Sequence, residues 1–297
     1  MAYHVATIVQ SGKSNAKISH GEIDSVRSCT ISLAASDDAG VNVCPRAMPK
    51  SQIVAMQKQG LTWEQIVDNA QSRGLSMCSA SCVTSEAGHG RMDFVKNPRA
   101  NLTRWYVENR AEFKAHALDE LWHEHSLLKA GQILACRPNL DSDVPWHRTF
   151  PEMFEVPASY WDYTKDSKRL LQDMPDNYHV TYSVNDGTSP DDWQRVYDSG
   201  CNIAVVFDSE WQPGGKEEYR RFGMVPQWWT DPNGYRWRVV DGDKSDFRFL
   251  DPGPVCVALR LKGGIFGRWM ARFSGFAVPL ARHLRTWYWD THPAKAA

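Results

Sequence analysis

The order of apolar and polar positions along the chain predicts short buried strands that alternate with helices. Apolar runs rich in β-branched residues predict strands at 28–33, 133–137, 160–164, 178–183, 201–207, 237–240 and 254–261. Apolar residues at helical spacing predict helices at 49–74, 101–131, 147–156, 166–173 and 190–199. Strand–helix units of this length are typical of a parallel sheet with right-handed crossovers. At least seven strands favour an α/β barrel, complete or open, over a doubly wound sheet.

Caps and breakers mark the ends of two helical segments. Thr62 followed by Gln65 is a capping box inside the 49–74 segment. Asn101 can cap a long helix, which Gly131 ends. The pattern therefore predicts one continuous helix between Asn101 and Gly131.

The stretches outside the strand–helix units divide the chain. Residues 1–27 are polar and are expected to form an N-terminal arm. The barrel-like domain spans 28–263, and its segment 209–236, rich in Gly, Pro and Trp, is expected to be an insertion or lid. Residues 264–297 are expected to form an aromatic and basic C-terminal extension.

Length and charge set limits on the kind of protein. At 297 residues the chain can bury a sizeable core, and its net charge of −1 gives no overall attraction to nucleic acid or anionic membranes. It has neither a run of about 18 apolar residues nor a signal-peptide pattern, so we expect no membrane partner and a cytoplasmic location. Its seven cysteines are then expected to be thiols or metal ligands rather than disulfides.

Polar side chains gather where the predicted strands end. Because the carboxyl ends of parallel strands meet on one face of a barrel, these side chains are expected to line one site for a small molecule or nucleotide. The candidate catalytic residues are Lys165, Asp143 and Arg137, and the candidate cofactor-binding residues are Asp162, Ser183, Asn185, Asp243 and Arg248. Basic groups suit a phosphate or carboxylate, and acidic groups suit a hard metal ion or ribose hydroxyls. The alternative is that the Asp and Asn residues only form turns.

Three cysteines, Cys44, Cys78 and Cys82, lie in loops downstream of the first predicted strand. Cys78 and Cys82 are one helical turn apart, so both sulfurs can face one metal centre, and Cys44 can add a third. Three thiolates suit a [4Fe-4S] cluster with one open iron, or zinc with a fourth ligand such as Cys29 or His89. Unliganded loop cysteines remain the alternative, because the spacing is looser than in a zinc ribbon.

Short motifs spread over residues 10–265 are similar to those of a known family. They are Gly12, Asn15 and Lys17; Cys44-Pro45; Cys78 with Cys82; Arg137 with Ser142-Asp143; and Tyr163-Thr164-Lys165. On these residues the chain resembles the gene-product-88-like proteins of phages and plasmids. The resemblance implies an origin in a mobile genetic element rather than a particular activity.

The layout also resembles the radical S-adenosylmethionine barrels, in which three cysteines after the first strand hold a [4Fe-4S] cluster. That resemblance implies an enzyme that cleaves bound S-adenosylmethionine and acts on a nucleotide or nucleic-acid-related substrate. Those enzymes have compact Cys-x-x-x-Cys-x-x-Cys spacing, whereas here Cys44 lies 34 residues before Cys78, and no Gly-Gly-Glu follows the next strand. The alternative is a non-catalytic protein that binds nucleic acid or a host protein, with zinc holding the cysteines.

Overall fold

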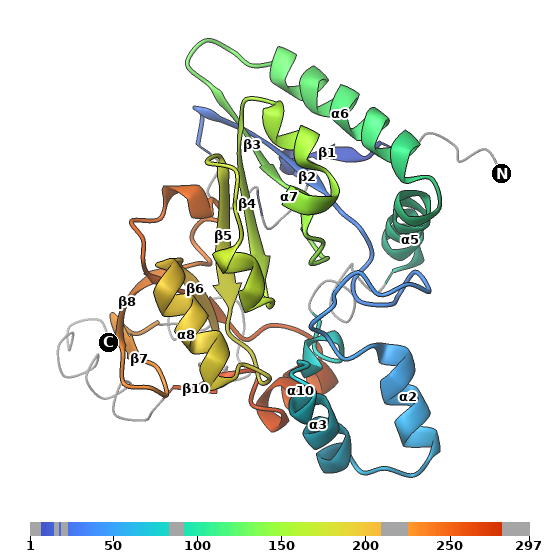
Figure 1. The fold of residues 1–297 in the computed structure, drawn as a ribbon, viewed down its shortest axis with the longest axis vertical. Coiled ribbons are helices and arrows are strands. Elements are labelled where there is room, and N and C mark those ends of the chain that lie inside the picture. The colour runs from blue at the N-terminus through green and yellow to red at the C-terminus, as the bar shows by residue number, and fades with distance from the viewer. Residues whose placement is uncertain (1–6, 15–17, 19–22, 83–91, 209–224, 281–297) are drawn as a thin grey trace, which may run out of the picture.

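The computed structural model describes residues 7–14, 18, 23–82, 92–208 and 225–280 (Figure 1). Residues 209–224 of the expected insertion and 281–297 of the expected C-terminal extension therefore lie outside the described residues. Within the described part, no helix is both long enough and apolar enough to cross a membrane.

One sheet of ten strands organises the described chain, in the order β1-β2-β3-β4-β5-β6-β9-β8-β7, with β10 beside β6. The strands are β1 (Val9–Ser11), β2 (Val26–Ile31), β3 (Ile133–Arg137), β4 (Ala158–Thr164), β5 (Tyr178–Ser183), β6 (Ile203–Asp208), β7 (Trp228–Thr230), β8 (Arg236–Asp241), β9 (Cys256–Arg260) and β10 (Val278–Pro279). From β2 across to β8 every pairing is parallel, which confirms the predicted α/β class. Among the described strands the sheet is not closed, because β1 and β7 end it with antiparallel pairings.

Helices connect most of the parallel strands. They are α2 (Lys50–Lys58), α3 (Trp63–Ser72), η2 (Met77–Ser79), α5 (Asp93–Glu108), α6 (Arg110–Ser126), α7 (Trp146–Thr149), η4 (Pro151–Glu155), η5 (Ser167–Leu171), α8 (Pro190–Ser199), η6 (Arg248–Leu250) and α10 (Ile265–Phe273). The predicted capping box is confirmed: Thr62 and Gln65 cap each other's backbone at the start of α3. The short 3-10 segment η1 (Gly12–Ser14) follows β1.

The expected helix from Asn101 to Gly131 is wrong, because two helices, α5 and α6, occupy this segment. The backbone breaks at Asn109, with φ −132° and ψ 57°. The break brings the rings of Tyr106 and Phe113 to 5.3 Å, whereas seven residues of unbroken helix rise about 10.5 Å. Both helices can therefore pack their aromatic side chains into one core.

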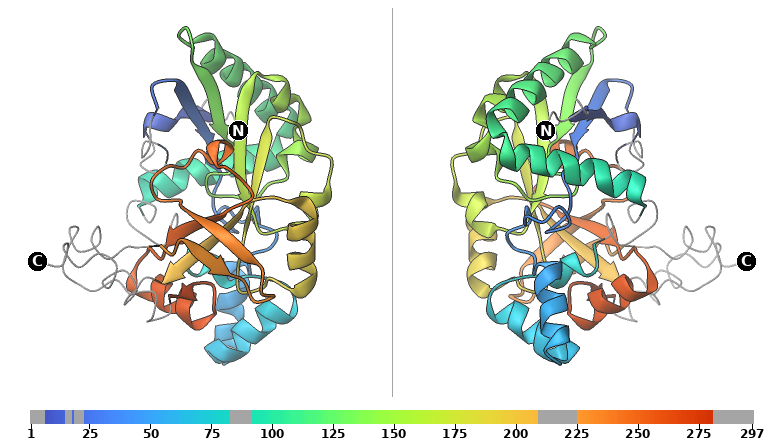
Figure 2. Two further views of the ribbon diagram at one scale, coloured as in Figure 1. Left: turned by 90° about the vertical axis from the view of Figure 1, so that its left-hand side faces the viewer. Right: turned by 90° about the vertical axis from the view of Figure 1, so that its right-hand side faces the viewer.

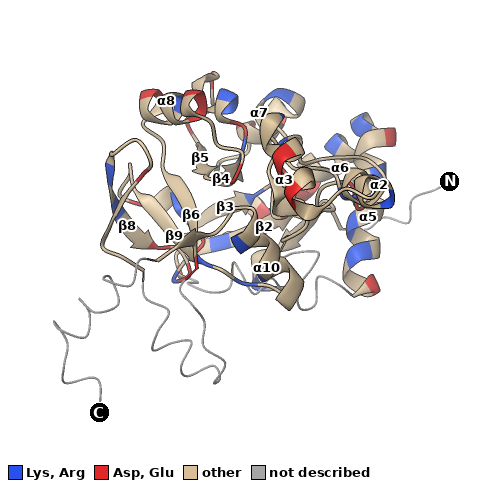
Figure 3. Ribbon diagram, turned by 90° about the horizontal axis from the view of Figure 1, so that it is seen from below, with Lys and Arg blue, Asp and Glu red and all other residues tan. Residues whose placement is uncertain are grey.

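Successive side chains of a strand point to opposite faces of the sheet, and the two faces differ here. The outer face carries residues such as Leu134, Cys136 and Tyr160, which pack in one buried cluster with side chains of α5, α6 and α7. Figures 2 and 3 show helices covering this side of the strands. The inner face carries the alternate residues, including Arg137 and Tyr163.

The chain between β8 and β9 crosses the inner face. Phe247 and Phe249 each place a ring 5.5 Å from that of Trp161, and η6 contacts β4 and β5. This segment plugs the inner face near the middle of the strands. The part of the inner face beyond it, toward the carboxyl ends of the strands, stays open as a cavity.

Part of the expected C-terminal extension belongs to the fold. β10 pairs with Phe207 and Asp208 of β6, beyond the point where β5 stops pairing at Ser183. In α10, Met270 packs with Met48 and Met77 of the cysteine-bearing segment. The segment 265–279 therefore covers one side of the cavity.

Candidate functional site

A cavity of about 500 Å³ lies at the carboxyl ends of the parallel strands, on the inner face. All three candidate metal ligands, Cys44, Cys78 and Cys82, line it. Of the candidates at the strand ends, the cavity lining contains Arg137, Asp143, Lys165, Ser183 and Asp243. The structure thus brings together candidate residues from six segments of the chain.

Cys44 lies in the loop that follows β2 and approaches the cavity from one side. Its Sγ accepts a hydrogen bond from the backbone N–H of Ser36 at 3.2 Å and donates to the carbonyl oxygen of Asp141 at 3.8 Å. Burial raises the pKa of the Cys44 thiol well above its usual value, and nearby Cys78 adds to this rise. Cys44 is therefore protonated at neutral pH when no metal is bound.

Cys78 lies on η2, whose position depends on a carboxylate from another part of the sheet. Asp186, after β5, accepts hydrogen bonds from Ser76 Oγ at 2.6 Å and from the backbone N–H of Met77 at 3.0 Å. Burial raises the pKa of the Cys78 thiol, although the positive charge of Lys165 opposes the rise. The cysteine turn is thus fixed against the carboxyl end of β5.

Lys165 follows β4 and extends its ammonium group into the cavity, 5.8 Å from the centre of the Phe276 ring. Burial acts to lower the pKa of Lys165, but its electrostatic interactions with the Cys78 sulfur, once ionised, and with the Asp143 carboxylate outweigh burial and raise the pKa. Lys165 is therefore a permanent cation within electrostatic reach of all three candidate ligands.

Arg137 and Asp246 form a buried ion pair on the inner face. Arg137 Nη1 lies 2.7 Å from Asp246 Oδ2, and the guanidinium carbon lies 4.8 Å from the centre of the Tyr163 ring. Burial acts to lower the pKa of Arg137, but Asp246 raises it further above its usual value. Arg137 is consequently a fixed positive charge that can donate hydrogen bonds but cannot act as a general acid or base.

Asp143 holds the cavity loop in place. One carboxylate oxygen accepts from Arg169 Nη1 at 2.5 Å, and the other accepts from the backbone N–H of Lys165 at 3.0 Å and from Thr164 Oγ1 at 3.3 Å. Because both oxygens are engaged, Asp143 supports the position of Lys165 rather than reaching freely into the cavity.

Asp243 belongs to an ionic cluster at the cavity edge. Its carboxylate lies 2.9 Å from Arg260 Nη1 and 2.6 Å from Lys262 Nζ. Asp241, two residues earlier, accepts from both terminal nitrogens of Arg260 at 2.7 and 2.9 Å. This cluster fixes the loop after β8 to the end of β9.

Asp162 does not line the cavity, because its side chain points to the outer face. It accepts hydrogen bonds from the Asn139 side chain at 2.7 Å, the Asn139 backbone N–H at 3.0 Å and the Tyr178 hydroxyl at 2.6 Å. Burial raises the pKa of Asp162 to about 7, against the influence of Arg169 and Arg137. Asp162 supports the fold behind the cavity.

Asn185 and Arg248 also lie outside the cavity lining. Asn185 closes a turn after β5, where its Oδ1 accepts from the backbone N–H of Gly187 at 2.9 Å. Arg248 is buried under the segment that crosses the inner face, bonded to the carbonyl of Ser245 and paired with Asp251 at 3.2 Å. Asn185 is bound to a neighbouring backbone N–H and Arg248 to a neighbouring carboxylate, so neither side chain is available to a ligand in the cavity.

The lining also contains residues that were not among the candidates, and Tyr163, Arg46 and Phe276 are examples. Tyr163 could have been found from strand alternation, since it lies two residues before Lys165 and shares its face. Arg46 and Phe276 carry no such signal, because they come from loops placed only by tertiary packing.

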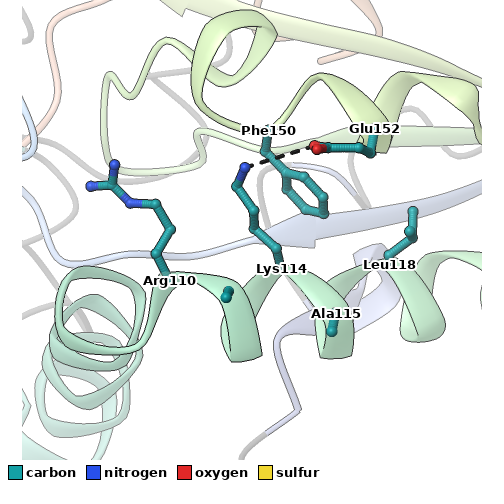
Figure 4. A pocket seen from close by; sticks show the side chains of 7 residues that line it. Arg110, Lys114, Ala115, Leu118, Phe150 and Glu152 are labelled. Atoms are coloured by element: carbon teal, nitrogen blue, oxygen red, sulfur yellow. Dashed lines mark ion pairs between the residues drawn. The ribbon is translucent and has the colours of Figure 1, made fainter.

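A second hollow lies between α6 and η4 (Figure 4). It is lined by Arg110, Lys114, Leu118, Phe150 and Glu152, among others, and Lys114 pairs with Glu152 at 3.7 Å. It contains none of the candidate residues.

The described residues contain no group of three His, Cys, Asp or Glu side chains that could hold one metal ion. A tetrahedral zinc site places its sulfur donors about 2.3 Å from one ion. In a four-iron cluster each thiolate binds its own iron, so the sulfurs are spread more widely. All three thiols line one cavity, and thiolate sulfur is a ligand for either centre, so the donor chemistry fits both a four-iron cluster and a zinc ion.

Comparison with known proteins gives one match. The model of a family described as gene product 88 matches residues 7–279 of the chain. No curated protein and no solved structure matches it.

Proposed function

The chain belongs to the gene product 88 family, and from that premise we propose that it is a phage- or plasmid-encoded iron–sulfur enzyme of the radical S-adenosylmethionine kind. Its substrate would be a nucleotide or a nucleic-acid-related molecule. The observation that supports this function best is the meeting of Cys44, Cys78 and Cys82 with Lys165 in one cavity. The cavity also lies at the carboxyl ends of parallel strands, where α/β enzymes place their chemistry.

In this proposal the three cysteines hold a [4Fe-4S] cluster through their thiolates. When bound, such a cluster with one iron free of cysteine supplies the electron that cleaves S-adenosylmethionine. Lys165 favours the thiolate form of the cysteines, because a nearby cation stabilises the negative sulfur. Since burial raises the pKa of the Cys44 and Cys78 thiols, cluster binding releases protons and is weakened by acid.

Anaerobic purification followed by iron and sulfide analysis tests this function. The proposal predicts about four iron and four sulfide per chain, as the cluster type requires, and loss of both in a Cys78→Ala, Cys82→Ala variant. Cys256→Ala is the matched control, because Cys256 is buried in β9 on the outer face and away from the cavity. Iron content that is absent from the wild type, or equal in the double variant and the wild type, would contradict the proposal.

A non-catalytic zinc protein that binds nucleic acid or a host protein is the second candidate. Its support is the exposed aromatic surface of α10, where Phe266 and Trp269 lie 5.5 and 6.0 Å from the Trp63 ring. Exposed aromatic rings can stack on unpaired bases. One zinc per chain without iron, lost in the same double variant, would favour this second candidate over the first.

A further inference from the structure

We propose that the cavity binds the oxyanion group of an organic ligand, a carboxylate or a phosphate, at a subsite formed by Lys165, Arg137 and Tyr163. This subsite deepens the proposed function, since it lies in the same cavity, but it does not require iron to be bound.

The carboxylates that line the cavity already have basic partners. The pairs are Asp141 with Arg99 at 3.0 Å, Asp143 with Arg169 at 2.5 Å, Asp243 with Lys262 at 2.6 Å and Asp246 with Arg137 at 2.7 Å. Arg46, another lining cation, lies 3.4 Å from Asp166. These charges therefore cancel locally and leave nothing to balance Lys165.

Lys165 is the cation in the lining whose ammonium group makes no ion pair with any residue that the structure describes. A half-buried ammonium without a counterion is costly, and an anionic ligand removes that cost.

Two further donors on the same face lack partners. Arg137 is only 8% exposed, and its Nε has no hydrogen-bond acceptor among the described residues. The buried hydroxyl of Tyr163 likewise has none there. A buried donor left unsatisfied costs about 1–3 kcal/mol. Two such donors lie side by side here, where the Arg137 guanidinium contacts the Tyr163 ring, and this indicates a place where a hydrogen-bond acceptor binds.

The three side chains are adjacent through the sheet. Tyr163 and Lys165 are two residues apart and therefore share the inner face, and Arg137 comes from β3, which pairs with β4. The guanidinium of Arg137 lies against the Tyr163 ring at 4.8 Å. These hydrogen-bond donors thus form a row that runs from the open cavity toward the aromatic cluster of Trp161, Phe247 and Phe249.

Aliphatic side chains at the ends of β6 and β9 also line the cavity. They are Val206, Leu259 and Leu261, and they alternate with the paired Arg260 and Lys262. A cavity of about 500 Å³ with both cationic and aliphatic lining suits an organic anion better than a bare inorganic one. The ligand would place its oxyanion at Lys165 and its uncharged part against the aliphatic side chains.

Anion binding by the full-length chain with Cys44, Cys78 and Cys82 all replaced by Ala tests the subsite without iron. The probes are sodium phosphate and sodium acetate, each compared with sodium chloride at equal ionic strength, and the readout is the midpoint of thermal unfolding against anion concentration. We expect at least one of the two anions to raise the midpoint beyond chloride, and their relative affinities show which oxyanion the subsite prefers.

Substitutions in that cysteine-free background assign the effect to the subsite. Lys165→Met should weaken the apparent affinity about tenfold or more, Tyr163→Phe should weaken it about fivefold, and Lys165→Arg should keep it. Lys114→Met is the control, because Lys114 lies at the second hollow and should leave the affinity unchanged. If Lys165→Met does not fold, the apparent anion affinities of Tyr163→Phe and Lys114→Met still test the subsite.

An equal response to phosphate, acetate and chloride would overturn the subsite, as would a Tyr163→Phe or Lys165→Met variant that binds as tightly as its parent. Anion binding in a protein that never holds iron would leave the subsite standing and remove the iron–sulfur function. Iron binding without any anion response would leave the iron–sulfur function standing and remove the subsite.

Discussion

The outer face of the sheet carries Cys136 and Tyr160 into an apolar core under the helices. The inner face, one residue further along the same strands, carries Arg137 to a polar cavity and Trp161 into a small aromatic cluster beneath it. The outer face is held by dispersion and burial of aromatic rings. The inner face is held by ion pairs, several of them only partly buried. Stability and chemistry are thus assigned to opposite sides of one sheet.

The two faces differ because successive side chains of each strand point to opposite faces of the sheet. In β4, Asp162 faces outward into a buried hydrogen-bond network, while Tyr163 faces inward beside Arg137. A polar residue near the end of a strand is therefore a site residue only when its position in the alternation places it on the inner face.

The largest expected effect comes from opening the outer core. Phe113→Ala should lower the free energy of unfolding by about 3–5 kcal/mol, because Phe113 is fully buried against Trp105 and Tyr106. Ser183→Ala, on the inner face, should change it by less than about 0.5 kcal/mol. Urea unfolding of both variants measures this, and equal effects would break the comparison between the faces.

The next largest effect is expected at Asp143, and it distinguishes a structural role of this carboxylate from a catalytic one. Asp143→Asn leaves the buried guanidinium of Arg169 without its counterion and should cost about 3 kcal/mol of stability, measured by urea unfolding. An unchanged free energy of unfolding would show that Asp143 does not hold the loop, and would return it to the candidate catalytic groups.

A smaller, pH-dependent effect is expected at Asp162. Burial raises its pKa to about 7 in the folded protein, against about 3.9 in the unfolded chain. Between these values the folded state holds a proton that the unfolded state has lost, so this group makes stability fall as pH rises, by up to about 1.4 kcal/mol per pH unit, and stay level above pH 7.

Urea unfolding between pH 5 and 8 checks this, with Asp162→Asn as the comparison. The difference in the free energy of unfolding between wild type and variant should change between pH 5 and 7 and become constant above pH 7. A difference that does not vary with pH would show that Asp162 is ionised throughout.

The smallest effect is expected at the exposed rim of the inner face. Lys262 is 47% exposed in its pair with Asp243. Lys262→Met should lower the free energy of unfolding by less than about 1 kcal/mol, as urea unfolding measures, because exposed ion pairs contribute little. A larger loss would mean that the ionic cluster with Arg260 acts as a unit.

Sequence patterns were sufficient for the longer parallel strands, since each apolar run near β3, β5 and β9 has the length and composition of a buried strand. They missed β1, β7 and β10, which are only two or three residues long. They also brought Cys44, Cys78 and Lys165 to one edge of the sheet. They missed the break at Asn109, which tertiary packing of Phe113 stabilises, and they treated Asp162 as a site residue because polarity alone does not reveal which face a side chain takes. Phe276 could not be found, since its place depends on how β10 joins β6.

Anomalous diffraction at the iron edge, from crystals of the anaerobically purified protein, tests whether the three cysteines hold an iron–sulfur cluster. We expect iron density in the inner-face cavity, in contact with the sulfur atoms of Cys44, Cys78 and Cys82. Iron density elsewhere, or a cavity without iron in a fully loaded preparation, would contradict this expectation.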